Sequence, residues 1–329
     1  MFAGRRIFIL SPHGTGWRRP RRRSNLRPEM KQLDPTSDAA RDLASGRFVI
    51  RTMDVTDMRR VPIPWMRDAG WNPGLNDAET FLTADANGFL IGELDGQPIA
   101  CVSAVRYDDN FGFMGCYIVD AAFRGRGYGM AVHEAGRGHL AGCVQGGDGV
   151  LENVAKYERI GRVLAYRNTR REAIRPEGLI RDSGVVPLES VPWSGVLDLD
   201  RECFPAARER FLRAWTSQPD AVSLAIPDPA APRRVLGYGV IRPCFVGWKI
   251  GPLFARDAEV ADILFRSLLA GIPAGSAFWL DVAEPNTAAT AMADAFGMKE
   301  VFATARMYTG TAPDVRLNQV FGLTTFELG

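Results

Sequence analysis

The sequence predicts an α/β (α+β) protein made of two domains in tandem, and three observations support this prediction. A chain of 329 residues is too long for one ordinary hydrophobic core. Both halves contain strand-like segments that alternate with helical segments. The order of these segments is shared, because "CVSAVRY…FGFMGCYIV" and "LGYGVIR…VGWKIGPLF" are each followed by a helix. We interpret this shared order as a degenerate internal repeat.

A basic leader is predicted to occupy residues 1–46 and to lack stable structure. Residues 1–31 contain nine basic residues and a single acid, Glu29. The stretch "RRIFIL" (Arg5 to Leu10) is similar to a twin-arginine export signal, but no apolar region or cleavage site follows it. Two alternatives stay open, namely a basic arm for nucleic acid or anionic lipid and a native start at Met30.

The composition of the remaining chain excludes several classes of function. Acids outnumber bases after the leader, which argues against a nucleic-acid-binding surface on the folded body. No stretch approaches the roughly 18 apolar residues of a membrane span. The five cysteines and three histidines show no metal-like spacing. We therefore expect a cytoplasmic protein, monomeric or homodimeric, with no metal ion and no nucleic-acid or membrane partner.

The first domain is predicted over residues 47–175. In order, we expect a strand at 47–53, a short helix from residue 56 or 57, a loop at 65–74, a helix at 75–85 and strands at 88–96, 97–107 and 111–119. A helix at 130–142, a weak strand near residue 144, a helix at 150–160 and a strand at 162–170 follow. Asp95-Gly96 is a hairpin signal, and Pro62 and Pro64 are expected to break the short helix.

The second domain is predicted over residues 185–329, after a boundary at 171–184. We expect a helix at 205–219, strands at 221–226, 233–242 and 245–254, a helix at 258–271, a strand at 277–283, a helix at 286–296 and a strand at 300–308. This order repeats the strand-to-helix succession of the first domain.

The stretch "FRGRGYGM" (Phe123 to Met130) joins an apolar strand to a helix and has the composition of an anion-binding turn. Its three glycines allow close approach of a bulky ligand, and the helix N-terminus adds backbone donors and positive potential. Its two arginines supply forked, permanently charged donors. The spacing matches neither the P-loop nor the Rossmann fingerprint. A pyrophosphate is the expected ligand, and a purely structural turn is the alternative.

The spacing R-x-x-G-x-G in this turn resembles motif A of the GNAT acetyltransferases, which bind acyl-coenzyme A. The resemblance implies that each domain has a mixed, mostly antiparallel sheet flanked by helices. It also implies that a splayed strand pairs with the pantetheine arm while the turn holds the pyrophosphate. By motif position the cofactor-binding residues are Tyr117, Ile118, Val119, Arg124, Gly125, Arg126, Gly127, Tyr128, Gly129 and Met130. The family's usual proline, three residues before the arginine, is Ala121 here.

A wider resemblance, to two-domain GNAT proteins of the YitH type, covers nearly all of residues 47–329. It is carried by "GWNPGLNDA" (70–78), "GPLFA" (251–255) and "FGLTTFELG" (321–329). The resemblance implies a subfamily and does not identify a substrate.

The segment "NVAKYERIG" (153–161) lies where motif B of the family belongs, and Tyr157 matches its tyrosine. There the phenol is implied to protonate the departing thiolate of coenzyme A. A packing role for this tyrosine is the alternative, because the usual phenylalanine after the helix is Arg162 here. Tyr157 is the predicted catalytic residue.

No general base is evident, because the strand "FGFMGCYIV" contains no carboxylate. Asp148, Glu152, Glu93 and Asp120 are the candidates, and relay through water is an equal alternative. Candidate acceptor contacts lie in the loop "WMRDAGWNPG" and just beyond it, a region that covers the acceptor site in GNAT folds. They are Trp71, Asn72 and Asp77.

The second half keeps a motif B frame in Asn286, Ala289 and Gly297, but Ala293 stands where the tyrosine should be. Its turn "RDAEVA" contains no glycine, so we expect no pyrophosphate site there. One coenzyme A per chain is therefore predicted. The second domain is expected to line the acceptor cleft through Trp248, Lys249 or Arg306.

Together these features predict an acyl-CoA-dependent N-acyltransferase. The expected reaction is acetyl transfer from acetyl-CoA, as co-substrate, to an amine of a small molecule, which makes the protein a GNAT-type N-acetyltransferase. The alternative is an acyl-CoA sensor or regulatory module without turnover, which the missing base favours.

Overall fold

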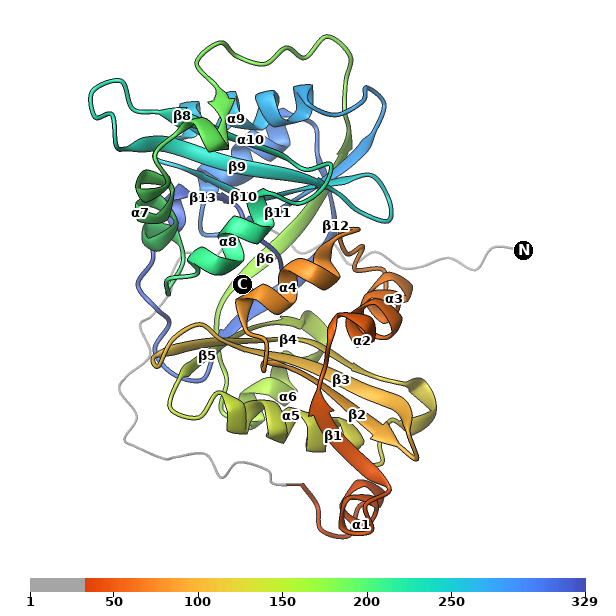
Figure 1. The fold of residues 1–329 in the computed structure, drawn as a ribbon. Helices are drawn as coiled ribbons and strands as arrows, with labels where there is room; N and C mark the ends of the chain where they lie inside the picture. Colours follow the sequence, from red (N-terminus) through yellow and green to blue (C-terminus); the bar gives the residue numbers. More distant parts are fainter. Residues whose placement is uncertain (1–32) are drawn as a thin grey trace, which may run out of the picture.

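The structure is a computed structural model that describes residues 33–329, and one mixed sheet runs through both halves of the chain (Figure 1). The strand order is β1-β2-β3-β4-β5-β12-β6-β11-β10-β9-β8-β7, and β13 pairs with β10 beside this path. In Figure 1 the first half forms the lower lobe and the second half the upper lobe, and β6 and β12 pass between them.

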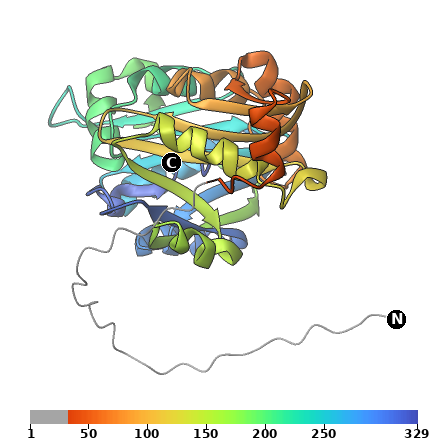
Figure 2. The same cartoon turned by 90° about the horizontal axis from the view of Figure 1, so that it is seen from below.

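The first half supplies six strands and most of the helices of the lower lobe. Its strands are β1 (Phe48–Thr52), β2 (Phe89–Leu94), β3 (Gln97–Arg106), β4 (Phe111–Val119), β5 (Val144–Val150) and β6 (Val163–Ile174). Its helices are α1 (Asp38–Ala44), α2 (Val55–Arg60), α3 (Pro62–Asp68), α4 (Asp77–Ala84), α5 (Tyr128–His139) and α6 (Val154–Arg159), with the 3-10 turns η1 (Ala121–Phe123) and η2 (Leu151–Asn153). Figure 2 shows α5 lying across the strands of this lobe.

The second half repeats this order. Its strands are β7 (Val186–Pro187), β8 (Val222–Pro227), β9 (Val235–Pro243), β10 (Trp248–Ala255), β11 (Ala277–Ala283), β12 (Lys299–Tyr308) and β13 (Val320–Gly322). Its helices are α7 (Trp193–Cys203), α8 (Glu209–Thr216), α9 (Ala258–Ala270) and α10 (Thr287–Ala295), with the 3-10 turns η3 (Leu188–Ser190) and η4 (Leu317–Gln319). Three of these elements, α7, β7 and β13, were not predicted from the sequence.

The two domains exchange strands. β12 of the second half pairs antiparallel with β5 on one side and with β6 on the other, and β6 also pairs antiparallel with β11. Each half therefore depends on a strand from the other to continue its sheet. The fold class was predicted correctly, but two separate sheets were expected and one continuous sheet is found.

Buried charge pairs reinforce the contact between the halves. Arg242 donates to both carboxylate oxygens of Asp77 at 3.0 and 3.1 Å, and Arg170 donates to both oxygens of Asp281 at 2.7 Å. Apolar packing joins the halves as well, since the ring of Phe81 stacks on that of Trp215 at 6.1 Å between centroids. Bidentate arginine pairs have a demanding geometry, so they fix the relative position of the two halves.

Two local expectations are corrected. The part of the predicted leader from residue 33 onward is ordered, because α1 packs on the first domain and the carboxylate of Asp42 accepts a hydrogen bond from the Tyr128 hydroxyl at 2.5 Å. The rest of the leader lies outside the described residues. Pro62 does not end the helical region, because it stands in the first turn of α3, where its missing N–H is not needed.

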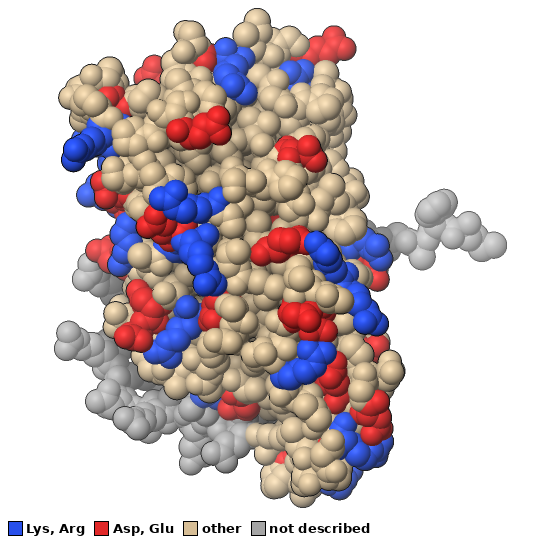
Figure 3. Space-filling model, in the orientation of Figure 1, with Lys and Arg blue, Asp and Glu red and all other residues tan. Residues whose placement is uncertain are grey.

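Surface charge is mixed on the face shown in Figure 3, where basic and acidic side chains alternate without a continuous basic patch. No described helix combines the length and the apolar character that crossing a bilayer requires.

Candidate active site

The site begins where β4 and β5 separate. The two strands pair in parallel from Phe111–Val144 to Phe113–Gly146, and their pairing ends there. Beyond this point β5 pairs with β12, while β4 keeps its antiparallel partner β3. The backbone groups of β4 that face the gap are thus free of a strand partner. We call this gap the first cleft.

A bulge in β4 faces the first cleft. The register between β3 and β4 shifts between the pairs Ser103–Gly115 and Cys101–Ile118, and Cys116 takes a left-handed φ of 45°. Such a bulge redirects backbone groups that would otherwise bond to a neighbouring strand. Cys116 itself is buried, and burial raises the pKa of its thiol well above the ordinary value, so it has the character of an inert core thiol.

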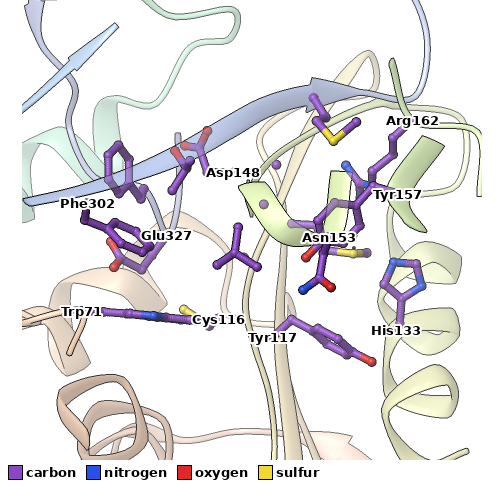
Figure 4. A pocket seen from close by; sticks show the side chains of 18 of the residues that line it. Trp71, Cys116, Tyr117, His133, Asp148, Asn153, Tyr157, Arg162, Phe302 and Glu327 are labelled. Carbon is purple, nitrogen blue, oxygen red and sulfur yellow. Dashed lines mark hydrogen bonds between the residues drawn. The ribbon is translucent and has the colours of Figure 1, made fainter. Parts of the chain in front are cut away.

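A cavity of about 230 Å³ occupies the first cleft and reaches the domain contact (Figure 4). Residues of the first half line it with side chains from β4, β5, α5, α6 and the early loop, and residues of β12 and the C-terminal segment complete it. The lining residues are Trp71, Met114, Gly115, Cys116, Tyr117, His133, Gly147, Asp148, Gly149, Val150, Asn153, Tyr157, Arg162, Arg170, Phe302, Thr304, Met307, Phe326 and Glu327. In Figure 4, Tyr157 and His133 lie at one end, and Glu327, Trp71 and Phe302 lie at the other.

Tyr157 reaches the cavity from α6 because β5 leaves room for its ring. A Cβ added at Gly149 would collide with that ring, so only glycine permits the tyrosine to lie against the strand. Burial raises the pKa of Tyr157, against the lowering effect of its hydrogen bond with Asn153. The phenol therefore stays protonated over a wide pH range and can act as a proton donor.

Arg162 lies beside Tyr157 as a buried cation. Its side chain approaches the Gln145 carbonyl and the Met114 sulfur, each at 3.5 Å, and within residues 33–329 no carboxylate pairs with it. Burial lowers the pKa of Arg162 to about 10, which still leaves it charged at neutral pH. Burial also lowers the pKa of His133 to about 4, so this imidazole is neutral. The phenol end of the cavity therefore holds donors and a positive charge.

Asp148 lies in the cavity wall, where both its oxygens are occupied. Arg306 donates to Oδ1 at 2.9 Å and to Oδ2 at 2.8 Å, and the Asn168 amide donates to Oδ1 at 2.8 Å. Burial raises the pKa of this carboxyl, and Arg306 opposes that effect. With its oxygens engaged in this way, Asp148 holds the domains together and is a poor candidate for the base.

The other three base candidates lie away from the cavity lining. Glu93 is paired with Arg51, Asp120 caps η1 by accepting from the Ala122 N–H, and Glu152 is exposed on η2.

The glycine-rich turn forms the N-terminus of α5 and has the predicted backbone geometry. Gly125 and Gly127 have φ values of 77° and 92°, which favour glycine. Gly127 is also the N-cap, and no side chain caps the helix. The arginines are held nearby: Arg124 donates to the Val119 carbonyl at 2.9 Å, and Arg126 pairs with Asp38 of α1 at 2.6 Å. The early helix therefore lies against the turn, a contact that the sequence did not indicate.

Of the three predicted acceptor contacts, only Trp71 lines the cavity. Asn72 instead exchanges two hydrogen bonds with the backbone of Val246 at 2.8 and 2.9 Å, across the domain contact. Asp77 is 1% exposed in its pair with Arg242. Lys249, expected as a cleft wall, donates to the carbonyls of Trp71 and Asn72 and so anchors this loop.

The second half has no equivalent opening. β10 and β11 also pair in parallel over only three positions, from Trp248–Phe278 to Ile250–Leu280. The space beyond is filled by β13, which pairs antiparallel with β10 and continues to Leu323, whose N–H donates to the Asp281 carbonyl of β11 at 2.8 Å. The equivalent helix N-terminus is capped by the Asp257 side chain.

Arg162 and Glu327 are among the cavity residues that were not predicted as site residues. In the sequence, Arg162 is only a departure from the motif B pattern. Glu327 belongs to the stretch "FGLTTFELG", which resembles the YitH type but suggests no role for the residue. Glu327 could not be placed from sequence, because its position depends on the contact between the halves, whereas Arg162 contacts Gln145 and Met114 within the first half. Among the described residues, no group of histidine, cysteine or acidic side chains could hold a metal ion.

Comparison with known proteins agrees with this geometry. A family model described as acetyltransferase (GNAT) family matches residues 53–145, and one described as acetyltransferase (GNAT) domain matches residues 196–322. The chain therefore has two GNAT domains in tandem and belongs to the GNAT acyltransferases. Members of this family use an acyl-CoA as co-substrate.

Individual relatives extend over most of the chain. Holothin acyltransferase of Pseudoalteromonas sp. (strain SANK 73390) is 28% identical over 265 residues, which are 80% of this chain and 89% of that protein. A putative acetyltransferase from Pyrococcus horikoshii has a TM-score of 0.72 at 22% identity and covers 86% of this chain and 96% of its own. A tandem GNAT protein from the clavulanic acid biosynthesis pathway has a TM-score of 0.56 at 13% identity, covering 80% and 99%. The two structures show a shared fold.

Proposed function

We propose that the protein is an N-acetyltransferase that transfers the acetyl group of acetyl-CoA to an amine of a small molecule. The observation that carries this proposal is the open first cleft, which lies beside β4, the strand that precedes the glycine-rich turn, and which contains a cavity lined by Tyr157. The relative named holothin acyltransferase supports a small-molecule acceptor. The resemblance to the YitH type is part of the same proposal.

The fit of coenzyme A rests on free donors. The edge of β4 without a strand partner, around Tyr117, Ile118 and Val119, would bond to the pantetheine arm through its free N–H groups, since the Val119 carbonyl already accepts from Arg124. The N–H groups from Gly125 to Met130 would bind the pyrophosphate, since no protein side chain caps this helix end. Arg124 and Arg126 would add charge at the mouth of the site, with Arg126 shared with Asp38.

Catalysis would consist of positioning and proton transfer. The amine nitrogen attacks the thioester carbon, backbone donors of β4 near Val119 stabilise the developing oxyanion, and the C–S bond breaks. Tyr157 donates its proton to the thiolate, and the neighbouring charge of Arg162 favours the negative sulfur. Trp71, Phe302 and Phe326 give the acceptor end apolar walls, and a volume of about 230 Å³ suits a small acceptor.

The competing proposal is an acyl-CoA sensor without turnover, and the lack of a carboxylate on β4 favours it. A thiol-release assay with acetyl-CoA and a panel of small amines separates the two proposals. An N-acetyltransferase releases coenzyme A only when a suitable amine is present, and mass spectrometry shows the acetylated amine. Tight binding of acetyl-CoA without amine-dependent release would support the sensor instead.

A further inference from the structure

The C-terminal segment of the chain crosses from the second domain into the first cleft. After β13 it runs over β3 and β4. The hydroxyl of Ser103 on β3 lies 3.5 Å from the Glu327 carbonyl, and the hydroxyl of Tyr107, just after β3, donates to the Leu328 carbonyl at 2.9 Å. A Cβ added at Gly115 would collide with the Glu327 carbonyl, so β4 has a glycine where the segment passes. β4 thus carries no side chain at this point, and Glu327 occupies the space beside it.

Glu327 has a carboxylate with spare capacity to accept a proton. One oxygen, Oε2, accepts a hydrogen bond from the Thr325 hydroxyl, which fixes the side chain. Its Oε1 has no hydrogen-bond partner within the described part of the chain. The residue is only 5% exposed, yet it lines the cavity together with Trp71 and Phe302 (Figure 4). An unsatisfied carboxylate oxygen that is shielded from bulk water is suited to bind an N–H donor.

The other acids near this end of the cavity are already engaged. Asp281 accepts two hydrogen bonds from Arg170, and Asp148 accepts two from Arg306. Glu327 interacts electrostatically with Arg170 and Lys249 but forms no close ion pair with either in residues 33–329. It is therefore the carboxylate of the cavity that remains available to a ligand.

We propose that Glu327 is the general base of the acyl transfer and is delivered to the first domain by the second. This inference rests on the proposed function, since it requires an amine acceptor. The nitrogen of the amine forms the C–N bond, the C–S bond breaks, and Glu327 accepts one N–H proton. Tyr157 gives its proton to the sulfur, and exchange with solvent returns both groups to their starting states. Thr325 is a positioning residue that orients the carboxylate.

The test is the Glu327→Gln variant, with Glu152→Gln as a matched control on the exposed η2. We expect kcat/KM for the amine to fall about 10²-fold or more in Glu327→Gln, with unchanged affinity for acetyl-CoA by calorimetry. The control should keep both the rate and the affinity.

A structural role is the competing explanation, because the Glu327 charge also balances nearby cations. Glu327→Asp separates the two roles, since it keeps the charge but withdraws the carboxylate by one methylene. If Glu327 is the base, Glu327→Asp should have a reduced kcat and an unchanged KM for acetyl-CoA. The comparison of Glu327→Asp with the wild type is then the test if Glu327→Gln does not fold. Wild-type kcat in either variant would overturn the base assignment alone. A wild-type protein without turnover on any amine would overturn the proposed function and this inference together.

Discussion

Arg306 on β12 of the second domain donates two hydrogen bonds to Asp148 on β5 of the first, at 2.9 and 2.8 Å. The two strands are neighbours in the sheet, with Arg306 directly opposite Asp148 in the register. The pair therefore lies at the junction of the two halves, and its Asp148 forms part of the wall of the cavity.

Arg306→Met should destabilise the protein by about 3–5 kcal/mol, because it leaves the Asp148 carboxylate buried without its partner. Chemical denaturation measures this free energy of unfolding. Arg59→Met is the control, because Arg59 forms an exposed pair with Glu79 that contributes less than about 1 kcal/mol. Equal effects of the two substitutions would show that the buried pair does not join the halves.

Gly127→Val should abolish binding of coenzyme A in calorimetry. A Cβ at this position would lie 2.8 Å from the Ser37 hydroxyl oxygen, and its φ of 92° disfavours a branched side chain. The turn would therefore shift and its N–H groups would no longer converge. Circular dichroism checks that the variant folds.

Gly138→Ala, in the helix that follows this turn, is the matched control. Its added Cβ would meet nothing within 4 Å, so the substitution should keep affinity for coenzyme A and stabilise the protein by about 0.5–1 kcal/mol. Undiminished affinity in Gly127→Val would contradict the assignment of the turn.

Tyr157→Phe should lower kcat about 10²-fold with little change in KM for acetyl-CoA. Because burial raises the pKa of Tyr157, its acid form persists to higher pH than that of a free tyrosine. In the wild type the rate should therefore fall on the alkaline side as the phenol ionises, and the variant should lack this fall. An unchanged kcat would assign Tyr157 to packing.

Arg162→Met should raise the melting temperature and lower kcat. The buried guanidinium has a pKa lowered to about 10, so its charge destabilises the folded state below that pH and less so as the pH rises through it. Each kcal/mol gained corresponds to roughly 2 °C in a chain of this size. Differential scanning calorimetry at pH 7 measures the gain. A lower melting temperature would show that packing by the side chain outweighs its charge.

One coenzyme A should bind per chain, because β13 fills the space between β10 and β11 that corresponds to the first cleft. Titration of the full-length protein measures the stoichiometry. The isolated second half should not be used for this titration, because it would lack β6, the strand that pairs with both β11 and β12. Two sites per chain, or residual binding in a Gly127→Val protein, would contradict this prediction.

Local patterns predicted the parts of the site that lie close together in sequence. The turn around Gly127 was predicted from its glycine spacing, and Tyr157 was assigned by the resemblance of residues 153–161 to motif B. Contacts between distant segments were not predictable in this way. Asn72 and Asp77 were assigned to the acceptor because their loop was recognised, but their partners, Val246 and Arg242, become neighbours only after the halves pack.

The C-terminal stretch shows the same limit. "FGLTTFELG" has neither helical nor strand periodicity, so no element could be assigned to it. Its role follows from pairing with β10 and from its path along β4, which are long-range contacts. Glu327 therefore received no role from the sequence, although it is nearly inaccessible in the structure.

Because β6 and β12 each pair with strands of the other half, the two halves are arranged like the subunits of a domain-swapped dimer, but within one polypeptide. In a dimer of separate chains, a cavity lined by both partners would come apart on dilution. Here the covalent link makes the second half a permanent neighbour, at an effective concentration set by the tether. Specific activity should therefore stay constant as the protein is diluted, even though one wall of the cavity comes from the other domain.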